Sequence, residues 1–77
     1  METESTLKKI FSSVLGISET AITDTTSPAN TPSWDSMNAI VLITEIEKAF
    51  GVRFSYDEAM GVKTFADVIA LVQSKRP

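Results

Sequence analysis

Apolar residues recur at helical spacing in three separate segments of this sequence, and this periodicity constrains the fold more than any other feature. In the first segment they follow the i, i+3, i+4, i+7, i+8 pattern at Leu7, Ile10, Phe11, Val14 and Leu15. Gly16 follows directly, where a left-handed C-terminal cap would stand. The pattern predicts a helix that ends at Gly16 and is capped at its start by Thr3 or Ser5.

A second apolar stripe begins after Asp35 and Ser36 and ends at Gly51. Lys48 lies in the last turn, where a cation favours a helix end. The segment is the most apolar of the chain and predicts a second helix. Its apolar positions are Met37, Ile40, Val41, Ile43, Ile46 and Phe50, with Leu42 and Ala49 broadening the stripe.

Two further helix starts follow. Ser55 and Glu58 have the S-x-x-E spacing of a capping box and predict a brief third helix that is ended by Gly61. Thr64 and Asp67 repeat this arrangement before a last helix that runs to about Ser74. Its apolar face comprises Phe65, Val68, Ile69 and Val72. We expect Phe50, Phe54 and Phe65 in the core.

The segment from Ile17 to Trp34 lacks this periodicity and contains Pro28 and Pro32, with Ile22 as its main apolar anchor. It predicts a long loop. Loops beyond roughly 12 to 15 residues are uncommon in compact domains and tend to be functional or mobile. The alternative interpretation is a plain surface connection.

These features together predict the fold class. The 3 glycines fall just past predicted helix ends, and the 3 prolines fall outside predicted helices. We expect one all-α domain over residues 1–77, a small four-helix bundle with a long loop between its first two helices and a short third helix.

Composition excludes several kinds of chemistry. The sequence has no cysteine and no histidine, which excludes thiolate metal sites and the Ser-His-Asp and Cys-His arrangements of nucleophilic catalysis. Ten acidic against seven basic residues give a net charge of -3, which disfavours nucleic acid and anionic membranes and favours basic partner proteins. The N-terminus lacks the apolar block of a signal peptide. We therefore expect a cytoplasmic monomer.

Ser36 is the candidate functional residue. It lies beside Asp35, after the long loop and at the predicted start of the second helix, where the positive helix end favours an attached or bound phosphate. A simple N-terminal cap accounts for the same dipeptide, and such caps are far more common.

The whole arrangement resembles the acyl carrier protein family. The resemblance rests on the order and spacing of five pieces: Leu15-Gly16-Ile17, Asp35-Ser36-Met37 against the family's Asp-Ser-Leu, the spacing of Ile40, Ile43 and Ile46, the segment from Ile46 to Val52 against Leu-Glu-x-x-Phe-Gly-Ile, and the stretch from Thr64 to Val68. It covers nearly the entire chain.

The resemblance implies a carrier that is not itself an enzyme. A phosphopantetheinyl transferase would attach 4'-phosphopantetheine from coenzyme A to Ser36, and the terminal thiol of this arm would hold an acyl group as a thioester. Asp35 would help the transferase to place its magnesium and substrate. Acyl-activating enzymes, acyltransferases or synthases would be the other partners.

The second helix is the family's main recognition surface, and here the sequence departs from the usual acidic pattern. Glu45 and Glu47 supply acid, but Asn38 and Val41 stand where carriers of primary fatty acid synthesis commonly have carboxylates. Met37 and Val41, one turn apart, would present an apolar patch beside Ser36. An inward, core position is the alternative for both.

Trp34 is a second departure, since the family more often has a small or aliphatic residue at this position. Its side chain could pack over the loop or contact a partner. Together these departures predict a specialised, free-standing carrier of fatty acid, polyketide or other acyl metabolism. A D-alanyl or aminoacyl carrier, or an unmodified helical interaction module with the same fold, are the alternatives.

Overall fold

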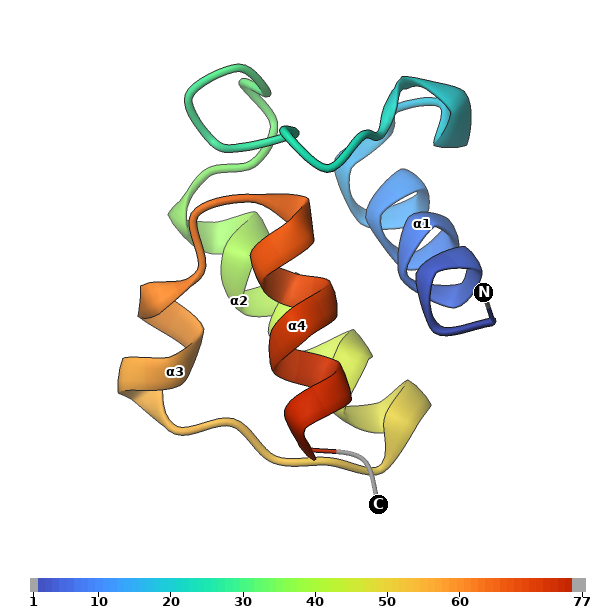
Figure 1. The fold of residues 1–77 in the computed structure, drawn as a ribbon. Helices are drawn as coiled ribbons and strands as arrows, with labels where there is room; N and C mark the ends of the chain where they lie inside the picture. Colours follow the sequence, from blue (N-terminus) through green and yellow to red (C-terminus); the bar gives the residue numbers. More distant parts are fainter. Residues whose placement is uncertain (1, 76–77) are drawn as a thin grey trace.

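The computed structural model describes residues 2–75, which form helices and no strand. Four α-helices follow one another: α1 (Glu2–Leu15), α2 (Ser36–Phe50), α3 (Tyr56–Gly61) and α4 (Phe65–Lys75), shown in Figure 1. A short 3₁₀ helix, η1 (Glu19–Ala21), interrupts the long connection between α1 and α2. The predicted all-α fold with a long first loop and a short third helix is confirmed.

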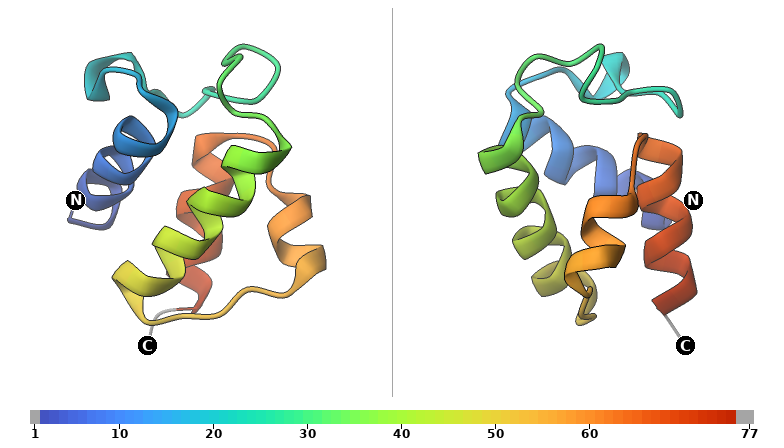
Figure 2. Two further views of the ribbon diagram at one scale, coloured as in Figure 1. Left: turned by 180° about the vertical axis from the view of Figure 1, so that it is seen from behind. Right: turned by 90° about the vertical axis from the view of Figure 1, so that its left-hand side faces the viewer.

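Helix α1 packs against both α2 and α4. Figures 1 and 2 place α1 on one flank of this pair and α3 on the opposite flank. The long loop crosses one end of the bundle, where it joins the end of α1 to the start of α2. The start of α2 is thus at the loop-covered end.

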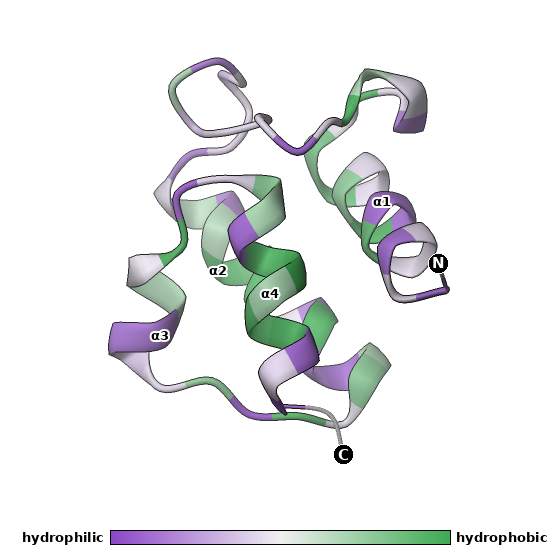
Figure 3. Cartoon of the chain, in the orientation of Figure 1, coloured by the Kyte–Doolittle hydropathy of each residue, from purple (hydrophilic) through white to green (hydrophobic). Residues whose placement is uncertain are grey.

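One hydrophobic cluster fills the centre of the bundle. Figure 3 shows apolar residues concentrated on α2 and α4, while the loop is mostly polar. Phe11 is central, since its ring meets both Trp34 and Phe65 edge to face, with centroids 5.1 and 4.9 Å apart. The buried hydrophobic residues are Leu7, Phe11, Leu15, Ile22, Trp34, Leu42, Ile46, Phe65, Val68 and Val72. Of the phenylalanines expected in the core, Phe65 is buried, while Phe50 and Phe54 pack half-buried at its edge.

Most predicted helix ends are confirmed. Gly16 and Gly51 adopt φ of 68° and 66°, the left-handed conformation that glycine accepts without steric cost. Gly61 differs, because it is the last residue of α3 and the chain leaves the helix at Val62 in an extended conformation. The predicted caps Thr3 and Ser5 are wrong, since α1 already includes both residues.

The inward face of α2 also differs from the predicted stripe. Leu42 and Ile46 are buried, and Ala39 and Phe50 pack against the same core. Ile40 was predicted among the stripe residues, but 68% of its side chain is exposed. Apolar residues occupy most sides of this helix, so the sequence pattern alone misplaced its inward face.

The long loop is fixed to the bundle at several points. Ile22 is buried, which confirms its predicted role as an anchor. The carbonyl oxygens of Asp24 and Thr26 accept hydrogen bonds from the backbone N–H groups of Ala66 and Phe65, at 3.2 and 2.8 Å. These bonds join the loop to the first turn of α4.

Candidate functional site

Ser36 is the first residue of α2, and its side chain is exposed. Asp35 precedes it as the N-cap in an extended conformation, and its Oδ1 accepts a hydrogen bond from the backbone N–H of Asn38 at 2.9 Å. This cap fixes the direction in which the chain enters the helix. It also presents Ser36 at the positive end of the helix dipole.

Asn38 joins this first turn to the loop. Its Nδ2 donates a hydrogen bond of 2.7 Å to the backbone oxygen of Ser33. Sequence reasoning treated Asn38 only as a missing carboxylate. The structure shows that its amide has a structural function that a carboxylate could not perform, because an ionised carboxylate has no N–H to donate.

Among residues 2–75, the structure shows no base hydrogen-bonded to the Ser36 hydroxyl. The sequence contains no histidine, and the neighbouring Asp35 carboxylate accepts the N–H of Asn38. A serine hydroxyl without an adjacent base is a weak nucleophile. Ser36 can therefore be the acceptor of a group that another enzyme transfers, rather than the nucleophile of a hydrolase.

A pocket of about 330 Å³ opens beside Ser36, between α2 and α3. Its lining is largely apolar. The buried residues Trp34 and Phe11 line it, and α3 contributes Ala59 and Met60. The remaining lining residues are Pro28, Asp35, Ser36, Ala39, Leu42, Ile43, Ile46, Val62 and Val68.

The surface of α2 near Ser36 is apolar. Met37 and Val41 are 78% and 43% exposed, so the predicted apolar patch is present, and Ile40 enlarges it. We call these three residues the α2 apolar patch. Sequence reasoning missed Ile40 because its spacing fits an inward stripe equally well.

The two acidic candidates on α2 lie in different environments. Glu45 is exposed, and its carboxylate is 3.9 Å from the Lys48 ammonium group. Glu47 is half-buried, and its Oε2 accepts a hydrogen bond from the backbone N–H of Phe54 at 2.8 Å. Glu45 is thus available to a partner, while Glu47 holds the chain that follows α2.

Trp34 belongs to the core. Only 5% of its side chain is exposed, and its ring packs edge to face on Phe11. Of the two predicted interpretations, packing under the loop is the one that this geometry supports. A direct partner contact is not compatible with such burial, so we remove Trp34 from the candidate recognition surface.

The described part of the chain shows neither a metal cluster nor a membrane span. Among residues 2–75, no three acidic side chains come together in a way that could hold a metal ion. None of the helices in that range is long and apolar enough to cross a membrane.

Comparisons with known proteins agree on one family. A family model described as a phosphopantetheine attachment site matches residues 5–72. The acyl carrier protein of Coprothermobacter proteolyticus is 29% identical over 68 residues, which cover 88% of this chain and 83% of that protein. The solution NMR structure of the holo acyl carrier protein from Geobacter metallireducens superposes with a TM-score of 0.85 at 29% identity, covering 97% of this chain and 86% of that one.

The residues present fit such a covalent group. An exposed serine hydroxyl stands at a helix start, and an apolar pocket adjoins it. Proteins of this kind hold phosphopantetheine covalently and serve partner enzymes as carriers without being enzymes themselves. The match over most of the chain and the shared fold show that this chain belongs to the acyl carrier protein family of phosphopantetheine-binding carriers.

Proposed function

We propose that Ser36 is the attachment site of 4'-phosphopantetheine and that the chain carries acyl groups as thioesters on this arm. The observation that carries the proposal is the exposed Ser36 side chain at the capped start of α2, beside an apolar pocket. The helix dipole favours the negative charge that a phosphodiester adds at this position. The bound group supplies the thiol that this cysteine-free chain lacks.

The chain's own part in the modification is small. Ser36 Oγ bonds to the pantetheine-side phosphorus of coenzyme A and forms a phosphodiester, while the P–O–P bond breaks and 3',5'-adenosine diphosphate leaves. The hydroxyl proton passes to a base of the transferase. Because no base among the described residues activates the hydroxyl, the transferase and its metal must do so. Asp35 holds the helix start in place, and by family resemblance its carboxylate also helps the transferase to position magnesium.

Intact mass spectrometry tests the attachment site. The apo protein is incubated with coenzyme A and a broad-specificity phosphopantetheinyl transferase, and we expect the mass of one phosphopantetheine to be added. Ser36→Ala abolishes the addition. Ser33→Ala is the matched control, because Ser33 lies in the same loop end and contributes its backbone oxygen to the contact with Asn38. An unmodified wild type, or a modified Ser36→Ala, would contradict the proposal.

We propose a specialised acyl pathway in the cytoplasm rather than primary fatty acid synthesis, and the α2 apolar patch is the observation that supports the specialised pathway. By family resemblance, carriers of the primary pathway bind basic partners through carboxylates after the serine, whereas Met37, Ile40 and Val41 are exposed here. A partner with an apolar docking surface fits this patch better than a basic one, because buried apolar area contributes to binding without a charge to match. The partners are acyl-activating enzymes, acyltransferases or synthases.

Adding a carboxylate to the patch tests this pathway. Val41→Glu should increase acyl transfer from the holo protein to a primary fatty acid synthase enzyme that has a basic docking surface, and the increase should fall with added salt. Ala70→Glu adds the same charge at an exposed site of α4 and is the control. If the wild-type holo protein already transfers acyl groups to that enzyme as fast as a carrier of primary fatty acid synthesis does, the proposed specialised pathway is wrong.

A D-alanyl carrier is the second candidate. Met37, 78% exposed directly after Ser36, completes the Asp-Ser-Met order that D-alanyl carriers share. Incubation of the holo protein with ATP and a D-alanine-activating ligase distinguishes the two. The mass of one D-alanyl group would favour this candidate, whereas loading by a fatty-acyl ligase alone would favour the first.

A further inference from the structure

Helix α3 forms a wall of the pocket, although none of its side chains is buried in the core. It supplies Ala59 and Met60 to the lining. Its six residues are far fewer than the roughly 12 to 15 that an isolated helix needs to be even marginally stable in water. Contacts other than core packing must therefore stabilise it.

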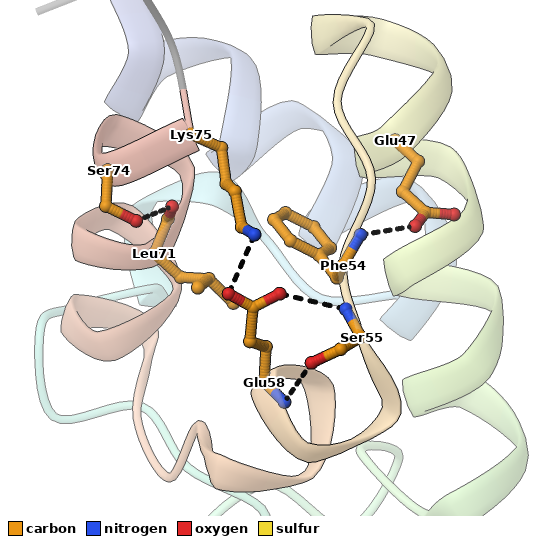
Figure 4. A network of polar contacts seen from close by, with 7 residues as sticks. All are labelled: Glu47, Phe54, Ser55, Glu58, Leu71, Ser74 and Lys75. Atoms are coloured by element: carbon orange, nitrogen blue, oxygen red, sulfur yellow. Dashed lines mark hydrogen bonds and ion pairs between the residues drawn. The ribbon is translucent and has the colours of Figure 1, made fainter.

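A polar cluster at the start of α3 provides these contacts, as Figure 4 shows. Glu58 Oε1 accepts the backbone N–H of Ser55 at 2.9 Å, and Ser55 Oγ accepts the backbone N–H of Glu58 at 3.1 Å. The other carboxylate oxygen of Glu58 is 2.7 Å from Lys75 Nζ in the last turn of α4. We call Ser55, Glu58 and Lys75 the α3 latch.

The latch combines two functions in one carboxylate. Glu58 completes the capping box that starts α3 and also ties that helix to α4. The preceding connection is fixed separately, because Glu47 on α2 accepts the N–H of Phe54. Loss of the ion pair would therefore release α3 from α4 while leaving its connection to α2 in place.

We propose that Glu58 is a positioning residue that holds α3 against the pocket beside Ser36, and that its ion pair with Lys75 sets how often this wall opens. The two side chains are 33% and 31% exposed, so dissolved ions can reach the pair and screen it. Opening should therefore increase with ionic strength. The relevance of this opening to an acyl group rests on the proposed function of Ser36, but the opening itself does not.

Trp34 reports on the pocket directly. It is the single tryptophan of the chain, it is buried, and it lines the same pocket as Ala59 and Met60 of α3. Collisional quenching of its fluorescence by acrylamide requires the quencher to enter. Quenching thus measures opening of the wall, while amide hydrogen exchange measures which helix opens.

The test uses the full-length apo protein with Lys75→Met, which removes the ion pair without changing α3 or the pocket lining. We expect hydrogen exchange in α3 and quenching of Trp34 to rise about two- to five-fold, as the loss of a partly exposed ion pair predicts. Exchange at Phe11 in α1 should not change. Added salt should raise both signals in the wild type and leave Lys75→Met nearly unaffected.

Two variants serve as controls. Lys75→Arg keeps a cation at this position, so hydrogen exchange in α3 and quenching of Trp34 should both remain at their wild-type levels. Lys48→Met removes the exposed pair with Glu45 on α2 and should change neither signal. Equal exchange increases in α1 and α3 would indicate general destabilisation and overturn the proposal, as would unchanged quenching in Lys75→Met. Intact mass after transferase treatment reports separately on Ser36, so failure of either proposal is distinguishable from failure of the other.

Discussion

The ring of Trp34 packs edge to face on Phe11, with centroids 5.1 Å apart and ring planes at 90°. Phe11 belongs to α1, whereas Trp34 ends the long loop two residues before Ser36. This contact therefore fixes the loop end, and with it the start of α2, to α1. The tryptophan acts on the candidate site by holding it in place.

Replacement of Trp34 should consequently affect stability more than recognition. Trp34→Ala should reduce the free energy of unfolding by about 3 to 5 kcal/mol, as expected for truncation of a large buried aromatic residue. Trp34→Phe keeps an aromatic ring at this position and should cost less. Urea denaturation followed by circular dichroism measures both. A loss below about 1 kcal/mol for the alanine variant would mean that the ring is not a core residue.

Asp35 offers a second test, since capping and magnesium placement require different features of its side chain. Asp35→Ala removes the acceptor for the Asn38 N–H and should cost about 0.5 to 2 kcal/mol of stability. Asp35→Asn keeps an acceptor oxygen and should remain near wild-type stability, while the transferase modifies both variants more slowly. If Asp35→Asn is modified at the wild-type rate, the carboxylate charge has no part in the modification.

Features set by neighbouring residues were predictable from the sequence, because their signals are local. The left-handed glycines at positions 16 and 51 and the capping box of Ser55 and Glu58 are examples. Contacts between distant residues left no such signal. The ion pair of Glu58 with Lys75 and the contact of Trp34 with Phe11 depend on how the helices pack, which residue spacing does not reveal.

The candidate site shows the same division. Ser36 and Asp35 could be identified from their order and from their place after the loop. The environment of Ile40 could not, because a helix that is apolar on most sides fits its neighbours in more than one rotation. The amide of Asn38 likewise acquires its function only once the loop brings the Ser33 oxygen within 2.7 Å.

A pair of side-chain truncations tests which face of α2 is turned toward the core. Leu42 is 2% exposed and Ile40 is 68% exposed, two residues apart on the same helix. Leu42→Ala should reduce the free energy of unfolding by about 2 to 5 kcal/mol, because it leaves a cavity in the core. Ile40→Ala should change it by no more than about 0.5 kcal/mol. Thermal or urea denaturation compares them, and equal losses would contradict this orientation of the helix.

Acid should weaken the attachment of α3. The hydrogen bond from Lys75, followed by that from the Ser55 backbone, lowers the pKa of Glu58 below its ordinary value of 4.5. A carboxyl whose pKa is lower in the folded state stabilises that state when ionised. The contribution is therefore fully present above the unfolded-state pKa and is lost as the pH falls through the lower folded-state pKa. The charged group in direct contact with Glu58 is Lys75, and Asp57 precedes it on α3.

Glu58→Gln isolates the contribution of this one carboxylate to stability. Glutamine keeps an oxygen that can accept the Ser55 N–H but carries no charge for Lys75. The difference in free energy of unfolding between wild type and Glu58→Gln should favour the wild type at about pH 7 and shrink as the pH drops below 4.5. Urea denaturation across this range measures the difference, and carboxyl NMR of Glu58 gives its pKa directly. A difference that grows in acid would show that the ionised carboxylate does not stabilise the fold.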